Sequence, residues 1–180
     1  IDQFHKNHVQ AHEALLGKIA WTPELAKDSL HQWLENHAQF TFHKIKTAVT
    51  TWRNFYTSNI SLKRSFIGQE CFSETFHGWG FEDIEFGYRL WKKGLALHYQ
   101  EDCLVYHDHP QKFSQVLKNT KNARQNAEQF QILHPEVKLR PGKTKKALLY
   151  LIILLAYACP KKWFPQIYWW REWKKAWIRN

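Results

Sequence analysis

The sequence predicts an α/β or α+β body over residues 1–136, followed by a basic, tryptophan-rich helical tail over residues 137–180. Short candidate strands alternate with candidate helices as far as residue 135, which is the pattern of a mixed fold. All of the net charge of +10, and half of the ten tryptophans, lie beyond residue 137. A chain of 180 residues can bury one sizeable core but not those of two full-size domains.

The first elements follow from local patterns. Apolar positions on one helical face predict a short helix over about residues 3–16. A second helix is expected over about residues 25–41, with Thr22 as its cap and a proline in its first turn. Residues 48–62 are rich in β-branched and aromatic side chains, so we expect one or two short strands there, with a turn at residues 57–59.

A loop over residues 68–80 is expected to lead into a helix over about residues 82–93. Acidic side chains occupy the first turn of this helix and basic side chains its last turn, which complements the helix dipole. Gly94 suits the left-handed position that ends a helix. Apolar residues lie on two sides of the helix, which predicts that it packs within the body.

The last part of the body is predicted as two short strands and a long helix. Residues 95–99 and 103–106 have strand-like composition, and a polar helix should follow over about residues 112–133. His134 and Pro135 should stop this helix, because the residue before a proline is disfavoured in helical geometry.

The charge distribution restricts the classes of partner. Residues 138–180 contain eleven basic side chains and one acidic side chain, whereas residues 1–137 are balanced. The basic tail contains an apolar run that needs burial and has no nucleic-acid fold signature, which argues against nucleic acid binding. The three cysteines have no metal-ligand spacing and form no disulfide framework, which favours a reducing compartment.

The tail has features of a segment that lies on a membrane. Residues 147–159 form an apolar run that would be about 20 Å long as a helix, too short to cross a bilayer alone. Lysines flank this run, and Trp170, Trp173 and Trp177 share a helical face, with Arg171 turned away from it. We therefore expect residues 143–180 to contact a membrane surface. The alternative is a helix packed on the body with a solvated basic end.

The best candidates for a binding or catalytic site are the residues Gly78-Trp79-Gly80-Phe81-Glu82-Asp83. Glycines let a backbone approach a ligand, a tryptophan face suits the C–H surface of a sugar, and a carboxylate can accept a hydroxyl proton. This combination suggests carbohydrate chemistry. The competing interpretation is that Glu82 and Asp83 only complement the helix dipole and Trp79 is a core aromatic.

The stretch Phe76-His77-Gly78-Trp79-Gly80-Phe81-Glu82-Asp83-Ile84-Glu85-Phe86-Gly87-Tyr88-Arg89-Leu90 resembles the acceptor-side motif of glycosyltransferases. The similar proteins are GT-A-fold enzymes of family 2 and of the β-1,4-galactosyltransferase C-terminal type. Residues 59–64, Phe72-Ser73-Glu74 and Tyr106-His107 resemble other parts of the same family, in the same order. The resemblance covers roughly residues 1–135.

The resemblance implies transfer of a sugar from a nucleotide-sugar, usually a UDP-sugar, to an acceptor hydroxyl with inversion. Asp83 would be the general base, and Trp79, Gly80 and Glu82 would bind the acceptor. His107, with His109 as the local alternative, would bind a divalent cation, Mn2+ or Mg2+. By the same resemblance, Arg53, Asn59 and Ser61 would shape the donor or acceptor pocket, although strand packing with an exposed loop explains them equally well.

The family's Asp-x-Asp metal-binding element is not found in this sequence. We therefore expect these residues to be the C-terminal half of a GT-A fold with a basic amphipathic tail, and so a fragment of a longer hexosyltransferase. The expected role is polysaccharide or glycolipid synthesis, with a carbohydrate or glycolipid acceptor, on the cytoplasmic inner face of a membrane. The alternative is a non-catalytic carbohydrate- or membrane-binding remnant of the fold.

Overall fold

The computed structural model describes residues 10–139 and 141–178. The chain divides into two compact units. The first, called the sheet unit, comprises residues 1–74 and 82–110, and the second, called the helical unit, comprises residues 75–81 and 111–180. The sequence placed its single boundary after residue 136, which falls inside the helical unit.

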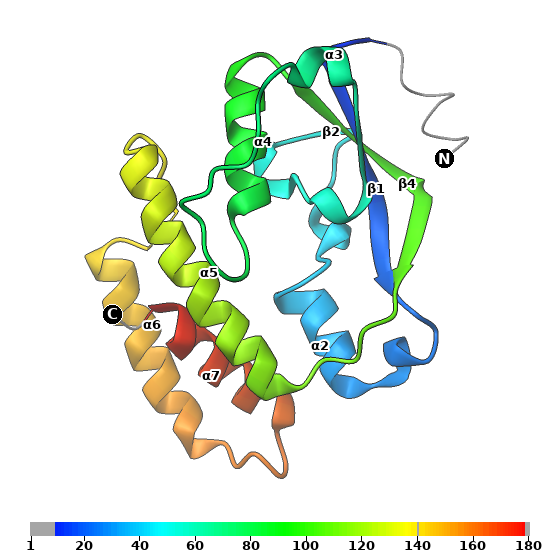
Figure 1. Ribbon diagram of the computed structural model, residues 1–180. Coiled ribbons are helices and arrows are strands. Elements are labelled where there is room, and N and C mark those ends of the chain that lie inside the picture. The colour runs from blue at the N-terminus through cyan, green and yellow to red at the C-terminus, as the bar shows by residue number, and fades with distance from the viewer. Residues whose placement is uncertain (1–9, 140, 179–180) are drawn as a thin grey trace. The chain divides into compact units, whose positions relative to one another are not determined.

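The sheet unit contains a four-stranded mixed sheet in the order β2-β4-β1-β3. Its two long strands are parallel neighbours, and a short antiparallel strand flanks each of them (Figure 1). The strands are β1 (Glu13–Trp21), β2 (Val49–Thr50), β3 (Ile60–Leu62) and β4 (Ala96–His107). The predicted mixed α/β architecture is therefore confirmed.

The predicted helix over residues 3–16 is wrong where the structure describes it, because residues 13–16 belong to β1. Ala14, Leu15 and Leu16 are all buried, as expected for a central parallel strand that is covered on both faces. Such a strand has a continuous apolar run, and some of its residues also have the spacing of apolar positions on one face of a helix. Residues 1–9 of the prediction lie outside the described residues.

The two strands predicted over residues 95–99 and 103–106 form one continuous strand, β4. The polar residues Gln100, Glu101 and Asp102 interrupt the strand pattern in the sequence. In the structure they coincide with a shift in the pairing of β1 with β4, after Gln100 has paired with Gly17. The irregularity absorbs the extra residues, so the strand continues to His107.

The second predicted helix is shorter than expected. A single 3-10 turn covers Leu25–Lys27, and the regular helix α2 is Ser29–His37. Asp28, not Thr22, is the N-cap, and its carboxylate accepts hydrogen bonds from the N–H groups of Leu30 and His31 at 3.0 and 3.1 Å. The cap lies seven residues after the end of β1, and the helix starts at the next residue.

Residues 48–62 form β2 and β3 as predicted, with 3-10 turns at Trp52–Asn54 and Thr57–Asn59 between them. A four-residue helix that was not predicted, α3 (Arg64–Ile67), follows β3. The predicted helix over residues 82–93 is α4 (Glu82–Lys92), and Gly94 has a φ of 94°. The core of the sheet unit joins β1 and α4; its buried side chains include Leu16, Ile19, Phe55, Phe86 and Leu90.

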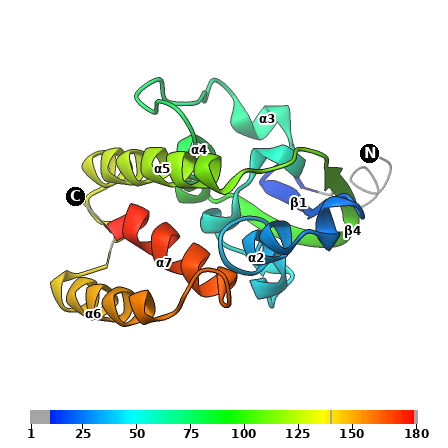
Figure 2. The same cartoon turned by 90° about the horizontal axis from the view of Figure 1, so that it is seen from below.

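The helical unit contains α5 (Phe113–Leu133), α6 (Lys143–Leu155) and α7 (Pro165–Ile178). The long helix and its end before His134 agree with the prediction. Helix α7 packs against both α5 and α6 and lies between them (Figure 2). Arg171, predicted to turn away from the tryptophan face of this helix, is buried, with its guanidinium 3.9 Å from the ring centre of Tyr157. Within the described residues, no helix combines the length and apolarity needed to cross a membrane.

Candidate active site

Asp83 lies in the first turn of α4, and its carboxylate is held by backbone donors. The N–H of Ile84 donates to Asp83 Oδ1 at 2.8 Å, and the N–H of Thr57 also donates to the carboxylate. Burial raises the pKa of the Asp83 carboxyl to about 6, and the negative charge of Glu82 acts in the same direction. Asp83 is therefore a carboxylate at neutral pH, but one more basic than an exposed aspartate.

Glu82 precedes Asp83 at the helix start. Its Oε2 atom is buried and has no hydrogen-bond partner among the described residues. A buried carboxylate oxygen without a donor is costly, so it marks a place where a ligand hydroxyl could donate. This position fits the predicted role of Glu82 in binding an acceptor, which stays a prediction.

The segment that contains Arg53, Asn59 and Ser61 reaches Asp83 through Tyr56 and Thr57. Burial raises the pKa of the Tyr56 hydroxyl, and the charge of Asp83 raises it further. Two motifs that are 26 residues apart in the sequence thus meet at one carboxylate. The sequence does not single out Tyr56 or Thr57 within this segment, because a backbone N–H leaves no signal in residue type.

The three candidate residues of this segment have different surroundings. The guanidinium of exposed Arg53 lies 4.2 Å from the ring centre of Trp52. Ser61 is the central residue of β3 and pairs with Leu15 of β1. Asn59 is buried, and its side-chain amide donates to the carbonyl oxygens of Lys18 and Cys103 at 2.9 and 2.8 Å.

The contacts of Asn59 bridge the irregular stretch between β1 and β4. Gly17 makes this possible, because a Cβ there would lie only 2.8 Å from Asn59 Cγ. These contacts explain an asparagine at this position without any ligand. A pocket role for Arg53, Asn59 and Ser61 stays a prediction.

Trp79 and Gly80 belong to the helical unit, where Asn126 of α5 holds their loop. The Asn126 amide donates to the carbonyl oxygens of His77 and Gly80, at 3.0 and 2.7 Å. Trp79 is 46% exposed, so its ring is available to a ligand and is not a core aromatic. Asn126 is not among the predicted site residues. Its position between Ala123 and Phe130, on the buried side of α5, is the feature of the sequence that indicates a polar contact.

Gly80 and Phe81 both have positive φ, 91° and 78° respectively. This conformation is easy for glycine and strained for phenylalanine. The ring of Phe81 stacks on Trp177 of α7 and meets Phe130 of α5 edge-on, with centroids 6.1 and 6.2 Å away. This packing compensates for the strained backbone directly before Glu82.

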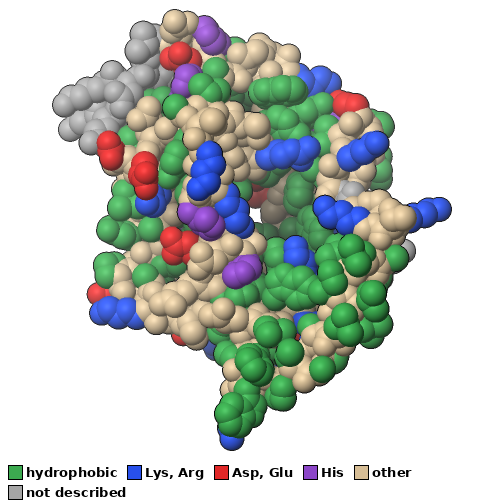
Figure 3. Space-filling model, turned by 180° about the vertical axis from the view of Figure 1, so that it is seen from behind, with side chains coloured by type: hydrophobic (Ala, Val, Ile, Leu, Met, Phe, Trp, Pro, Cys, Tyr) green, Lys and Arg blue, Asp and Glu red, His purple; other side chains and the backbone are tan. Residues whose placement is uncertain are grey.

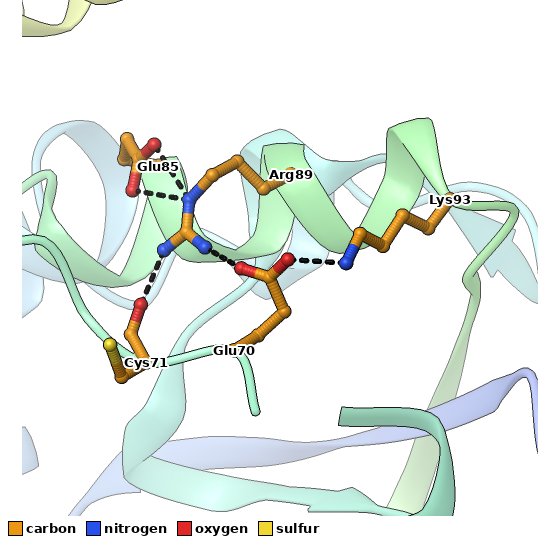
Figure 4. Close-up of polar contacts among 5 residues, drawn as sticks. All are labelled: Glu70, Cys71, Glu85, Arg89 and Lys93. Carbon is orange, nitrogen blue, oxygen red and sulfur yellow. Dashed lines mark hydrogen bonds and ion pairs between the residues drawn. The ribbon is translucent and has the colours of Figure 1, made fainter. Parts of the chain in front are cut away.

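A network of charged groups fixes the start of the loop before this motif (Figure 4). Arg89 Nε donates to both carboxylate oxygens of buried Glu85, at 2.9 and 3.1 Å. Nη1 of Arg89 donates to the carboxylate of Glu70, and Nη2 donates to the carbonyl oxygen of Cys71 at 2.6 Å. Lys93 also pairs with Glu70. The network therefore ties residues 70–71 to α4.

His107 lies at the end of β4, opposite Trp21 at the end of β1. Its ring packs against Trp21 and Phe40, with centroids 5.4 and 5.2 Å away, and His109 is 6.1 Å away. Burial lowers the pKa of His107, and His109 lowers it further, which favours the neutral imidazole that can bind a metal. The carboxyl ends of parallel strands are common ligand sites in α/β sheets.

The residues around His107 do not form a complete metal site. Within residues 10–139 and 141–178, no group of three or more His, Cys, Asp or Glu side chains could hold a metal ion. His107 fits as one ligand of a divalent cation, and the described residues do not supply the others.

A cavity of about 300 Å³ in the sheet unit was not predicted from the sequence. Phe40, Tyr99 and the ion pair of Lys18 with Glu101 are among the residues that line it. Phe40 also contacts His107, so the cavity adjoins the aromatic cluster at the strand ends. Its volume is at the lower end of the range of ligand pockets.

Part of the chain is similar to known proteins. Residues 39–108 match the model of a family described as the N-terminal domain of galactosyltransferase. The matched range includes Tyr56, Thr57, the Trp79–Asp83 motif, α4 and β4. Residues 39–108 are therefore similar to a glycosyltransferase family domain, which supports the resemblance seen in the sequence.

The relatives include polysaccharide synthases. Over 79 residues the chain is 30% identical to chondroitin synthase of Pasteurella multocida (strain Pm70) and 32% identical to chondroitin synthase of Escherichia coli. Over 67 residues it is 30% identical to hyaluronan synthase of Pasteurella multocida. These matches cover 43, 43 and 37% of this chain but only 8, 11 and 7% of the respective relatives.

Proposed function

We propose that the chain is the acceptor-side part of an inverting glycosyltransferase. The enzyme would transfer a hexosyl group from a nucleotide-sugar, a UDP-sugar in our proposal, to an acceptor hydroxyl in polysaccharide or glycolipid synthesis. The glycosyltransferase family domain supports sugar transfer in general, and the names of the relatives support a polysaccharide product. The nucleotide-binding Asp-x-Asp half would lie in another part of a longer protein.

The observation that carries the proposal is the environment of Asp83. A general base must be unprotonated at the working pH and still basic enough to accept a hydroxyl proton. A pKa of about 6 meets both requirements at neutral pH. In the proposed reaction Asp83 removes the acceptor proton while the acceptor oxygen attacks the anomeric carbon, on the face opposite the departing nucleotide. The bond to the nucleotide diphosphate breaks as the new glycosidic bond forms.

The acceptor would be bound by the residues on either side of Phe81. The exposed ring of Trp79 offers a flat surface to a sugar ring. The hydrogen bond from the Asn126 amide to the carbonyl oxygen of Gly80 holds the backbone beside Trp79 in place. The unpartnered oxygen of Glu82 would accept a hydrogen bond from an acceptor hydroxyl. Arg53 and Ser61 would contribute to the pocket through the segment that reaches Asp83.

A divalent cation, Mn2+ or Mg2+, is the proposed cofactor. When bound, it would neutralise the diphosphate of the leaving nucleotide. His107 would be one of its ligands, because its imidazole is neutral at physiological pH. The remaining ligands would come from the donor and from parts of the enzyme beyond the described residues.

The decisive experiment compares Asp83→Asn with the wild type in the full-length protein. We expect the rate of transfer from a radiolabelled UDP-sugar to an oligosaccharide acceptor to fall by about 10³-fold. UDP-sugar affinity, measured by calorimetry, should stay near the wild-type value. Asp102→Asn is the matched control, because Asp102 is an exposed aspartate of the same unit.

Turnover of Asp83→Asn at the wild-type rate would refute the base assignment. If the wild-type protein transfers no sugar from a panel of donors but still binds oligosaccharide, the non-catalytic alternative replaces the enzymatic proposal.

We also propose that the protein is peripheral on the cytoplasmic inner face of a membrane, through residues 143–180. Five lysines lie in residues 143–162, and no acidic residue occurs from residue 137 to residue 171. This charge would attract anionic lipid headgroups.

A further inference from the structure

The outer face of α6 exposes a continuous apolar surface. Leu148, Leu151, Ile152 and Leu155 have the i, i+3, i+4, i+7 spacing of one helical face, and each is between 40 and 67% exposed. The opposite side of α6 faces inward: Ile153 is 3% exposed, and the hydroxyl of Tyr150 donates to the carbonyl oxygen of Ile178 of α7.

The turn after α6 continues this surface. Tyr157, Trp163 and Phe164 are 48, 74 and 51% exposed. Figure 3 shows hydrophobic side chains gathered along the lower right, where α6 and this turn lie. We call the outer face of α6 together with these three aromatic residues the α6 surface.

The aromatic side chains of α7, by contrast, pack within the helical unit. Trp177 stacks on Phe81, and Trp169 lies 6.2 Å from Phe113 of α5. None of the four tryptophans of α7 is among the exposed large hydrophobic residues, although Trp163 before the helix is. Arg171 is buried against Tyr157 and Tyr168. The face formed by Trp170, Trp173 and Trp177 is therefore partly covered within the helical unit. This is the face that the sequence places on a membrane.

The charges around the α6 surface indicate its partner. Lys143, Lys145 and Lys146 lie at one end of the helix, and Lys161 and Lys162 lie in the turn beyond the other end. An apolar face with lysines at both ends and aromatic residues at one end fits the interface of an anionic bilayer. Thirteen helical residues span about 20 Å, which suits a helix lying along the surface.

We propose that the α6 surface, and not the tryptophan face of α7, inserts into the interfacial layer of an anionic membrane. This inference rests on the proposed membrane association and names the residues responsible for it. Helix α7 then acts as the support that holds α6 with its apolar face outward. A second copy of the chain and another segment of the same protein are the competing occupants.

The test is flotation of the full-length protein with vesicles of phosphatidylcholine, with and without 30% phosphatidylglycerol, a composition on the order of anionic cell membranes. The wild type should float with the anionic vesicles. The double variant Leu151→Glu and Leu155→Glu should reduce the vesicle-bound fraction at least tenfold. Both side chains are more than half exposed, so the variant should keep its fold, which circular dichroism would verify.

The matched control is Ile132→Glu, because Ile132 is 71% exposed in the same unit but belongs to α5 and not to the α6 surface. This variant should float like the wild type. If the wild type binds neither kind of vesicle, the membrane association itself is refuted. If the wild type and the double variant float equally, membrane association stands and the α6 assignment is refuted. If the α6 surface instead binds a second copy of the chain or another segment of it, the wild type does not bind vesicles. The double variant then differs from the wild type in its molecular mass in solution or in its proteolysis pattern, and the membrane assignment of the α6 surface is refuted.

Discussion

Phe55 packs directly on Gly87 of α4, so closely that a Cβ on residue 87 would lie 2.5 Å from the Cβ of Phe55. Both residues are buried. The contact holds the segment after β2 against the helix whose first turn contains Asp83. Thr57, whose N–H donates to the Asp83 carboxylate, lies two residues after Phe55 in the chain.

Gly87→Ala should destabilise the protein by about 2 kcal/mol, because the added methyl group overlaps a ring that has no free space. It should also lower transfer activity by displacing Thr57 from Asp83. Urea unfolding would measure the free energy of unfolding. Gly142→Ala is the control, since nothing lies within 4 Å of a Cβ there. Equal stability of the two variants would contradict the packing argument.

Asn59→Ala should cost about 2 kcal/mol, because it removes two hydrogen bonds and leaves the carbonyl oxygens of Lys18 and Cys103 without this donor. The exposed Asn36 offers a comparison, since Asn36→Ala removes one amide contact at the surface. The folded fraction of Asn59→Ala should keep a wild-type KM for the donor. A raised KM with unchanged stability would instead place Asn59 in the pocket.

The raised pKa of Asp83 has a consequence for stability. In the unfolded chain an aspartate titrates near pH 3.9, whereas in the folded protein Asp83 titrates at about 6. Between these values the folded state holds a proton that the unfolded state has lost. The free energy of unfolding should therefore fall as the pH rises through this window, by ~3 kcal/mol in total.

Asp83→Asn removes this titration, so it should be more stable than the wild type above pH 6 and similar to it near pH 4. Urea unfolding from pH 4 to pH 8 would measure the difference. A difference between Asp83→Asn and the wild type that is constant with pH would show that Asp83 ionises normally.

His107→Ala should raise the Mn2+ concentration needed for half-maximal transfer by about tenfold or more, since loss of a ligand weakens metal binding. His109→Ala should change it little. The measurement is the transfer rate of the full-length protein against Mn2+ concentration, after removal of metal with a chelator. The reverse order would assign the ligand to His109, and no change in either variant would exclude both histidines.

The sequence by itself determined the helix that begins at Glu82, its end at Gly94, the long helix before His134 and the glycosyltransferase motif. Each depends on local signals: charge at helix ends, a glycine with positive φ, a proline that stops a helix, and a short stretch of particular residue types. It also determined that the positive charge lies in the last quarter of the chain.

The tertiary structure decided what depends on distant partners. Residues 13–16 form a strand because β4 and β3 supply its hydrogen bonds, and local spacing cannot show a partner 80 residues away. Thr57 contacts Asp83 through its backbone N–H, which every residue type except proline would offer. Residues 147–159 are an apolar run in the sequence, and α7 has a tryptophan face. Only packing within the helical unit decided that α7 is partly covered while the outer face of α6 is exposed.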